Sequence, residues 1–346
     1  MALVPQAVGI VDRPHVPDAG DPHASTYKEW WHFNLLDDAS GLDVIVNLSL
    51  SGNVREAGRG EANLILLAHE PGIGWSGGVT RFDGLAAQVD EVSVDIALGE
   101  HRLAFADDHY EMRLVPDAES DIAVDLRLAP LTEPMMVWKN TPIGSGHINW
   151  VIIPSLSAAG SVRVGEREYP IRIARAYHDH NWGHWRWGEN FGWDWGFCSS
   201  ATEVEAAPLS LVYDRTVDRT GQQIAEHSLA LWHGEALLKF FSRRMMRMRK
   251  TGHYRGKVRR IPGVASLMEP SAVGTIPARV DIVARDGADW VEATYIPDTA
   301  IQIGIPRETG FGLVELNETL GWLTMSGEVA GMSFTVTRRS CFEFVG

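Results

Sequence analysis

Residues Asp43–Leu50 read DVIVNLSL, a stretch in which apolar and polar side chains alternate. Val44, Val46, Leu48 and Leu50 occupy every second position, and polar residues fill most of the positions between them. Successive side chains of a β-strand point to opposite faces, so this period of two indicates a strand with one buried face.

Similar short runs follow one another along most of the chain, and turn-forming pairs such as Ser51-Gly52 and Asp286-Gly287 separate them. The further runs are Ala62–His69, Val92–Leu98, Tyr110–Val115, Ile122–Leu128, His147–Ile153, Tyr169–Ala176, Leu209–Tyr213, Ser228–Trp232, Ala278–Ala284, Trp290–Ile296, Gly312–Glu315 and Ser333–Thr337. So many short strands predict an all-β fold, a sandwich or a barrel.

Helical patterns are weak throughout the sequence. The best candidate, Gly234–Arg249, is interrupted by arginines and could equally form strands. The 346 residues have room for two β domains in tandem, and we expect them at 1–188 and 189–346, each with few short helices.

The composition excludes some functions. A net charge of −14 argues against nucleic acid as a partner, because phosphate binding needs a surplus of Lys and Arg. The two cysteines, Cys198 and Cys341, are too few for a disulfide framework, and we expect buried thiols in a reducing compartment. Met1–His15 lacks the pattern of a signal peptide, and no apolar run approaches the roughly 20 residues that span a bilayer. We therefore expect a cytoplasmic protein.

The first chemically unusual segment is Glu29–Asn34, which reads EWWHFN. In a strand, Glu29, Trp31 and Phe33 would share one face, and Trp30, His32 and Asn34 the other. Either face places a polar or ionisable group beside an aromatic ring. A structural interpretation stays open, in which the two tryptophans close the end of a barrel and Glu29 pairs with an arginine.

The second segment runs from Tyr177 to Trp195 and holds five of the 13 tryptophans and three of the 13 histidines. Tryptophan brings a large apolar face and an N–H group that needs a partner when it is buried. Beside His and Asp side chains, such a cluster is typical of a small-molecule pocket. The alternative is an aromatic core between the domains, in which the His and Asp side chains satisfy one another.

Cofactor signals are few. His178 and His180 share a face of the predicted strand and His184 follows closely, which is adequate spacing for a transition metal, but a metal site is not our expectation. The glycine-rich phosphate-binding loops and the Gly-x-Ser-x-Gly nucleophile motif are absent from the sequence. We predict no cofactor.

The basic stretch Arg243–Arg260 stands out in this acidic chain. It could bind an anionic ligand or make peripheral contact with an anionic membrane that delivers an apolar substrate. A solvated loop or a protected edge strand explains it equally well.

Three motifs resemble the hydroxyneurosporene synthase (carotenoid 1,2-hydratase) and AttH-like superfamily. They are Glu29–His32, Tyr177–Gly183 and Gly192–Trp195, and the sequence differs from the family pattern in the His184, Trp185 and Trp187 that follow Gly183. The resemblance implies two tandem lipocalin-like β domains. It also implies relationship to hydratases of isoprenoid C=C bonds and to lipocalin-like cyclases of polyenes.

The expected activity is therefore acid-catalysed hydration or cyclisation of a C=C bond in a hydrophobic isoprenoid or polyene, in an aromatic pocket between the two domains. Asp179 is the expected acid, because an apolar pocket raises the pKa of a carboxyl group, and His178 or His180 would hold it or the water. We count Glu29 with these catalytic residues. The expected substrate-binding residues are Trp30, Trp31, His32, Tyr177, Asn181, Trp182, Trp193 and Trp195, of which Trp31, Trp182 and Trp193 would stabilise a cation.

Two other functions remain open. A pericyclase would hold its substrate in a reactive shape without proton transfer. A lipophilic-ligand carrier would use the mouth of a lipocalin-like barrel without chemistry. The sequence leaves the oligomeric state undetermined.

Overall fold

The computed structural model describes residues 3–200, 208–262 and 275–346. It confirms the all-β, lipocalin-like prediction, with two large sheets that curve into near-closed barrels. Within the described residues the chain forms two compact units, one of residues 3–186 with Ser200, the other of residues 187–199 and 208–346. The chain passes between the units more than once, and the expected domains 1–188 and 189–346 remain a prediction.

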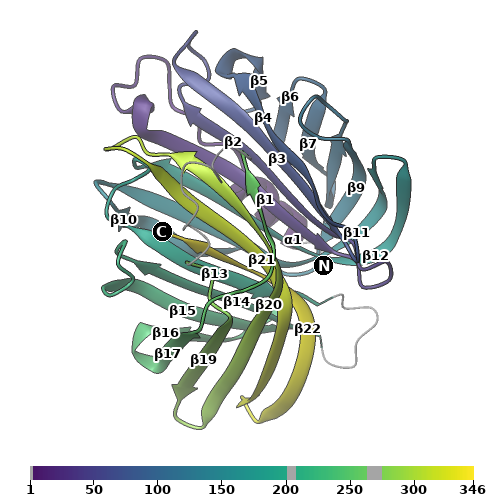
Figure 1. The fold of residues 1–346 in the computed structure, drawn as a ribbon, viewed down its shortest axis with the longest axis vertical. Helices are drawn as coiled ribbons and strands as arrows, with labels where there is room; N and C mark the ends of the chain where they lie inside the picture. Colours follow the sequence, from purple (N-terminus) through teal and green to yellow (C-terminus); the bar gives the residue numbers. More distant parts are fainter. Residues whose placement is uncertain (1–2, 201–207, 263–274) are drawn as a thin grey trace. The chain divides into compact units, whose positions relative to one another are not determined.

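Unit 1 begins with helix α1 and continues as an antiparallel sheet in the order β4-β3-β2-β1-β12-β11-β9-β8-β7-β6-β5, with β10 paired to β11 (Figure 1). Its elements are α1 (Leu3–Val11), η1 (Ala24–Thr26), β1 (Tyr27–Leu36), β2 (Asp43–Gly52), β3 (Gly60–Glu70), β4 (Gly74–Asp83), η2 (Gly84–Ala86), β5 (Ala87–Val89), β6 (Asp95–Leu98), β7 (His101–Ala106), β8 (His109–Leu114), β9 (Ile122–Pro130), β10 (Met135–Ile143), β11 (Gly146–Val164) and β12 (Arg167–His184).

Unit 2 is a sheet in the order β16-β15-β14-β13-β22-β21-β20-β19-β17, with β18 paired to β20. Its elements are β13 (Gly192–Cys198), β14 (Leu209–Val217), β15 (Ile224–His233), β16 (Ala236–Ser242), η3 (Arg243–Met245), β17 (Met246–Thr251), β18 (Val258–Ile261), β19 (Arg279–Asp286), β20 (Asp289–Pro306), β21 (Leu313–Val329) and β22 (Met332–Val345). Most of the ambiguous segment Gly234–Arg249 therefore forms strands, and η3 is a single short turn.

Each unit has its own hydrophobic core. In unit 1 the alternate residues Val44, Val46, Leu48 and Leu50 of β2 all lie in the core, as their spacing predicts. Helix α1 adds Val8, which is completely buried in the same core. Sequence analysis did not predict this helix. It is short, and it brings the residues that follow it into the interior of unit 1.

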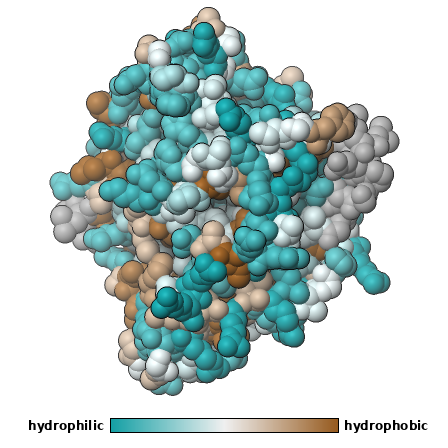
Figure 2. Space-filling view, turned by 90° about the vertical axis from the view of Figure 1, so that its left-hand side faces the viewer, coloured by the Kyte–Doolittle hydropathy of each residue, from teal (hydrophilic) through white to brown (hydrophobic). Residues whose placement is uncertain are grey.

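Both cysteines are buried, and neither Cys198 nor Cys341 forms a disulfide, as predicted. No helix in the described part of the chain is both long enough and apolar enough to cross a bilayer. On the face drawn in Figure 2, hydrophilic residues predominate and hydrophobic ones occur in small separate groups.

Gly183, the last residue of the Tyr177–Gly183 motif, is required by backbone packing between β11 and β12. Its φ is +155°, and a Cβ atom there would lie 2.2 Å from the carbonyl oxygen of His147. Because backbone cannot easily move aside, Gly183→Ala should lower the free energy of unfolding by about 1–3 kcal/mol. Urea unfolding monitored by circular dichroism measures this change. Gly9→Ala is the control, because a Cβ atom at Gly9 meets nothing within 4 Å. Equal unfolding midpoints for the two variants would contradict the prediction.

Candidate functional site

Strands β1 and β12 pair along the middle of the unit 1 sheet and carry most of the predicted residues. Trp31 lies opposite His180, and Phe33 lies opposite His178. Trp31 and Phe33 belong to the hydrophobic core, so this face points into unit 1. The predicted division of Glu29–Asn34 between two faces is confirmed. Strand alternation places Asp179 on the other face of β12 from both histidines.

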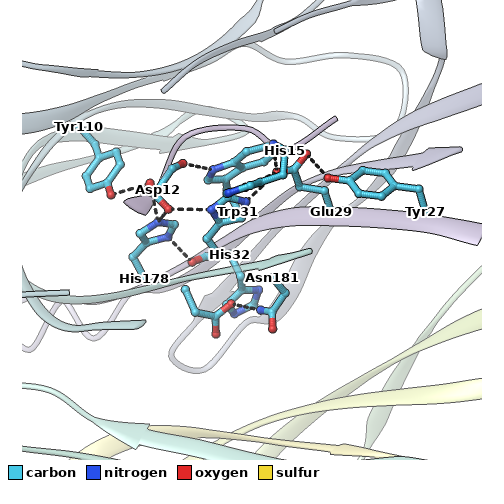
Figure 3. Close-up of polar contacts among 11 residues, drawn as sticks. Asp12, His15, Tyr27, Glu29, Trp31, His32, Tyr110, His178 and Asn181 are labelled. Atoms are coloured by element: carbon cyan, nitrogen blue, oxygen red, sulfur yellow. Dashed lines mark hydrogen bonds and ion pairs between the residues drawn. The ribbon is translucent and has the colours of Figure 1, made fainter. Parts of the chain in front are cut away.

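Asp12, the residue after α1, is the centre of a buried polar network on the inner face. Its two carboxylate oxygens each accept a hydrogen bond of 3.1 Å from Nε2 of His178, and Tyr110 donates a third of 2.7 Å. Nδ1 of His180 lies 3.2 Å from Oδ1 of Asp12. The indole N–H of Trp31 donates to the backbone carbonyl of Asp12, which fixes the chain there. The network joins α1 to three strands (Figure 3).

Glu29 is the second carboxylate of this network and is completely buried. Its Oε1 lies 2.9 Å from Nε2 of His180 and accepts a hydrogen bond of 2.7 Å from the backbone N–H of His15. Its Oε2 accepts a hydrogen bond of 2.8 Å from the Tyr27 hydroxyl (Figure 3). Glu29 therefore pairs with histidine, not with the arginine of the structural interpretation.

Electrostatics hold the inner network in its charged form. Burial raises the pKa of Asp12, but the charges and hydrogen bonds of His178 and His180 outweigh it and leave this pKa far below its ordinary value. The pKa of Glu29 is also lowered, because its interactions with the side chains of His15 and His180 outweigh burial. Burial lowers the pKa of His180, but Asp12 and Glu29 outweigh it and raise this pKa to about 9. Neither carboxyl is a proton donor at neutral pH.

Asp179 has different surroundings on the opposite face of β12. Its Oδ2 accepts a hydrogen bond of 3.0 Å from the Tyr177 hydroxyl, and its Oδ1 one of 2.8 Å from the Asn181 amide. The prediction that His178 or His180 holds Asp179 is wrong. Adjacent residues of a strand point to opposite faces, and the ring nitrogens of both histidines face acceptors of the inner network.

The same outer face carries His32 and Asn34. Nε2 of His32 lies 2.9 Å from the side-chain oxygen of Asn34. Burial lowers the pKa of His32 to about 4, although the hydrogen bond with Asn34 raises it. His32 is therefore neutral at physiological pH and can donate a hydrogen bond without carrying charge.

The predicted tryptophans of unit 1 fall into separate environments. Trp31 is completely buried and stacks on His180 with ring centroids 4.5 Å apart. Trp182 stacks on His15 at 3.9 Å, nearly parallel. Trp30 meets Trp185 edge-on at 5.3 Å. Trp31 and Trp182 therefore orient histidines of the inner network.

In unit 2 the predicted residues Trp193 and Trp195 lie on β13, on the face opposite the hydrophobic core. Trp195 is paired in register with Glu343 of β22, which in turn is paired with Glu318 of β21. The indole N–H of Trp193 donates to Oε1 of Glu343. The rings of Trp187 and Phe191 lie 5.8 and 6.1 Å from that of Trp193. The residues Trp187, Phe191, Trp193, Trp195, Glu318 and Glu343 are together called the Glu343 face below.

Glu343 is a buried carboxyl group suited to donate a proton near neutral pH. Burial raises the pKa of Glu343 to about 7, although the hydrogen bonds with Trp193 and Glu318 lower it. Sequence analysis missed this residue. The signal was available, because Glu343 interrupts the apolar run Cys341–Val345 and a charged residue is rarely buried without a specific partner.

A metal could be held in unit 1 by His15, Glu29 and His180, whose potential ligand atoms all lie within 4.8 Å of one another. The set weighed from sequence, His178, His180 and His184, does not assemble in this way. His178 is bound to Asp12, and Nδ1 of His184 lies 3.3 Å from the Thr26 hydroxyl, toward the end of β12.

Several residues of the basic stretch Arg243–Arg260 have structural partners. Lys250 forms an ion pair with the buried carboxylate of Asp194, and Arg249 lies 3.3 Å from Asp281. A cavity of about 460 Å³ elsewhere in unit 2 is lined by Arg219, Arg307 and Glu315, among others. Charged side chains in its lining distinguish it from the apolar pocket that the sequence predicts.

Neither protein-family models nor curated protein sequences match this chain. Solved structures do. The AttH-like protein NE1406 of Nitrosomonas europaea has a TM-score of 0.62 at 16% identity, over 98% of this chain and 99% of that one. Kievitone hydratase of Nectria haematococca has a TM-score of 0.58 at 13% identity, over 97% of this chain and 94% of that one. CghA with Sch210972 has a TM-score of 0.57 at 12% identity, over 96% and 93%.

These similarities show a shared fold along nearly the whole chain. They confirm the AttH-like, tandem lipocalin-like resemblance at the level of the fold. The carotenoid 1,2-hydratase part of the resemblance stays a prediction.

Proposed function

We propose that this chain is a cofactor-independent enzyme that hydrates or cyclises a C=C bond in a hydrophobic isoprenoid or polyene, by protonation from a buried carboxyl group. The single observation that carries the proposal is the Glu343 face, where an acid with a pKa near 7 lies beside tryptophan rings. The similarity in fold to a protein named for hydration, kievitone hydratase, supports it.

The first step is transfer of the Glu343 proton to one alkene carbon, which leaves a carbocation on its neighbour and a carboxylate on Glu343. The faces of Trp193 and Trp195 would stabilise this cation, each by about 1–2 kcal/mol when water is excluded. In hydration, the oxygen of a water molecule attacks the cation and then loses one proton, which restores the acid. In cyclisation, a second C=C bond attacks instead, and the proton that leaves the new cation restores Glu343.

Asp179 remains the second candidate for a catalytic carboxyl. Hydrogen bonds from Tyr177 and Asn181 to both of its oxygens suit a carboxylate that accepts a proton or orients a substrate. The inner residues Glu29, His178 and His180 are assigned a positioning role, because their polar atoms bind one another and Asp12.

A pericyclase is the alternative enzyme, and neutral His32 favours it. A neutral imidazole that is held by Asn34 can polarise a carbonyl group without transferring a proton. Such an enzyme would accelerate a reaction mainly through substrate shape, and a non-catalytic carrier would leave its ligand unchanged.

We also propose a cytoplasmic location, supported by the two buried cysteines that form no disulfide. Peripheral membrane contact through Arg243–Arg260 stays part of the proposal, because delivery of an apolar substrate from a membrane would suit a basic surface.

Incubation of the purified protein with a panel of isoprenoids and linear polyenes, followed by liquid chromatography and mass spectrometry, tests the proposed function. The expected products are one water heavier than the substrate or are cyclic isomers of it. A panel in which compounds bind, as detected by quenching of Trp fluorescence, but return unchanged would contradict catalysis and favour a carrier. Isomers formed at equal rates by Glu343→Gln, Asp179→Asn and the unmodified protein would favour the pericyclase.

A further inference from the structure

His15, Glu29 and His180 come from three separate segments of unit 1 and converge at the edge of the inner network. His15 lies between α1 and η1, Glu29 on β1, and His180 on β12. Oε1 of Glu29 is 2.9 Å from Nε2 of His180 and 3.5 Å from Nδ1 of His15. Nδ1 of His15 is buried and has no hydrogen-bond partner among the described residues. The two imidazoles therefore present nitrogen atoms to one carboxylate oxygen.

Neighbouring side chains orient His180 and Glu29, as the residues around the ligands of a metal site do. Nδ1 of His180 faces the Asp12 carboxylate at 3.2 Å, which leaves Nε2 to point toward Glu29 and His15. Metal-binding histidines usually have a carboxylate beside their second nitrogen, as His180 has Asp12 in this ion-pair contact. Glu29 is held by the Tyr27 hydroxyl through the oxygen that does not face His180.

Ring stacking fixes the two imidazole planes. His15 stacks on Trp182 with centroids 3.9 Å apart and an interplanar angle of 4°, and His180 stacks on Trp31 at 4.5 Å. The side chain of His15 is 29% exposed, whereas Glu29 is fully buried. The convergence point is therefore buried, and of the three side chains only that of His15 is partly exposed.

We propose that His15, Glu29 and His180 bind a zinc ion, with water in the fourth position. Two imidazole nitrogens and one carboxylate oxygen form a known zinc donor set. The ion would replace the proton on Nε2 of His180, and the carboxylates of Glu29 and Asp12 would balance its charge. This site lies on the opposite face of β12 from Asp179, includes no residue of the Glu343 face, and does not depend on the proposed function.

Titration of EDTA-treated full-length protein with zinc chloride, measured by isothermal calorimetry, tests the proposal. The expected result is one bound zinc per chain, with affinity reduced at least about 100-fold in His15→Ala. This variant is chosen because His15 is partly exposed and its loss leaves the Asp12 contacts intact. His23→Ala, which removes a nearby exposed histidine, is the matched control and should bind as the unmodified protein does.

Cobalt provides a second readout that reports the ligands directly. Co²⁺ added in place of zinc should give the visible absorption of a four-coordinate ion, and Glu29→Gln should weaken or shift that spectrum. Circular dichroism confirms that each variant is folded. Absence of zinc binding, binding that His15→Ala leaves unchanged, or binding that His23→Ala also removes would each overturn the proposal.

Discussion

Asp12→Ala is expected to lower the free energy of unfolding of unit 1 by about 3–5 kcal/mol, the cost of leaving buried charges without their partner. The substitution removes the carboxylate that faces His178 and His180, both almost completely buried. It also removes the acceptor of the Tyr110 hydroxyl. Hydrogen exchange along β1 and β12, followed by mass spectrometry during urea titration, measures the effect in unit 1 specifically.

Asp108→Ala is the control, because Asp108 also contacts a histidine, His109, but its side chain is 75% exposed. Exposed ion pairs contribute little, so a change below about 1 kcal/mol is expected. Similar destabilisation by Asp12→Ala and Asp108→Ala would contradict the description of the inner network as a charged, buried assembly.

The network also predicts how stability depends on pH. The folded pKa of His180, about 9, lies above its unfolded value of about 6.5. Its contribution is therefore complete below pH 6.5 and is lost as the pH rises through 9, a loss of about 3 kcal/mol. The lowered pKa values of Asp12 and Glu29 have the opposite consequence: their contributions are complete above the unfolded values near 4 and are lost in acid. The contribution of this network to stability should be greatest near pH 5–6.5, and Asp12→Ala should flatten its alkaline decline.

Glu343→Gln is expected to reduce kcat on the alkene substrate by about 100- to 10,000-fold, the range for removal of a general acid. Glutamine has nearly the same shape and retains an oxygen that can accept the Trp193 N–H, so the fold should persist. Glu292→Gln, whose side chain is 49% exposed and faces Arg285, is the matched control and should leave kcat unchanged.

The pH dependence of the unmodified enzyme gives an independent check. Only the protonated form of Glu343 can donate, so kcat should fall as the pH rises above about 7. An unchanged kcat in Glu343→Gln together with a large loss in Asp179→Asn would transfer the acid role to Asp179, as the sequence first indicated.

The alternation of side chains was sufficient to predict the all-β class and part of the site. It located β2 and divided Glu29–Asn34 correctly between two faces of β1. The same rule, applied to Tyr177–Trp182, separates Asp179 from His178 and His180. The prediction that Asp179 contacts His178 or His180 did not apply this rule.

Other parts of the site depend on contacts that no local pattern contains. Asp12 reaches His178 across 166 residues of sequence, after a short helix that has weak sequence signals. Glu343 meets Trp193 only because β22 returns to pair with β13, 150 residues from that tryptophan. Both contacts depend on the order of the strands in the sheets. The periodicity of the sequence does not predict that order.

The most direct test of acid-initiated chemistry is to run the reaction in D₂O and to locate deuterium in the product by NMR. Protonation of an alkene by a carboxyl group that exchanges with solvent predicts one deuterium bound to carbon in the product of the unmodified enzyme. It also predicts that Glu343→Gln forms this product at least about 100-fold more slowly. A product formed at full rate without deuterium on carbon would contradict the proposed function.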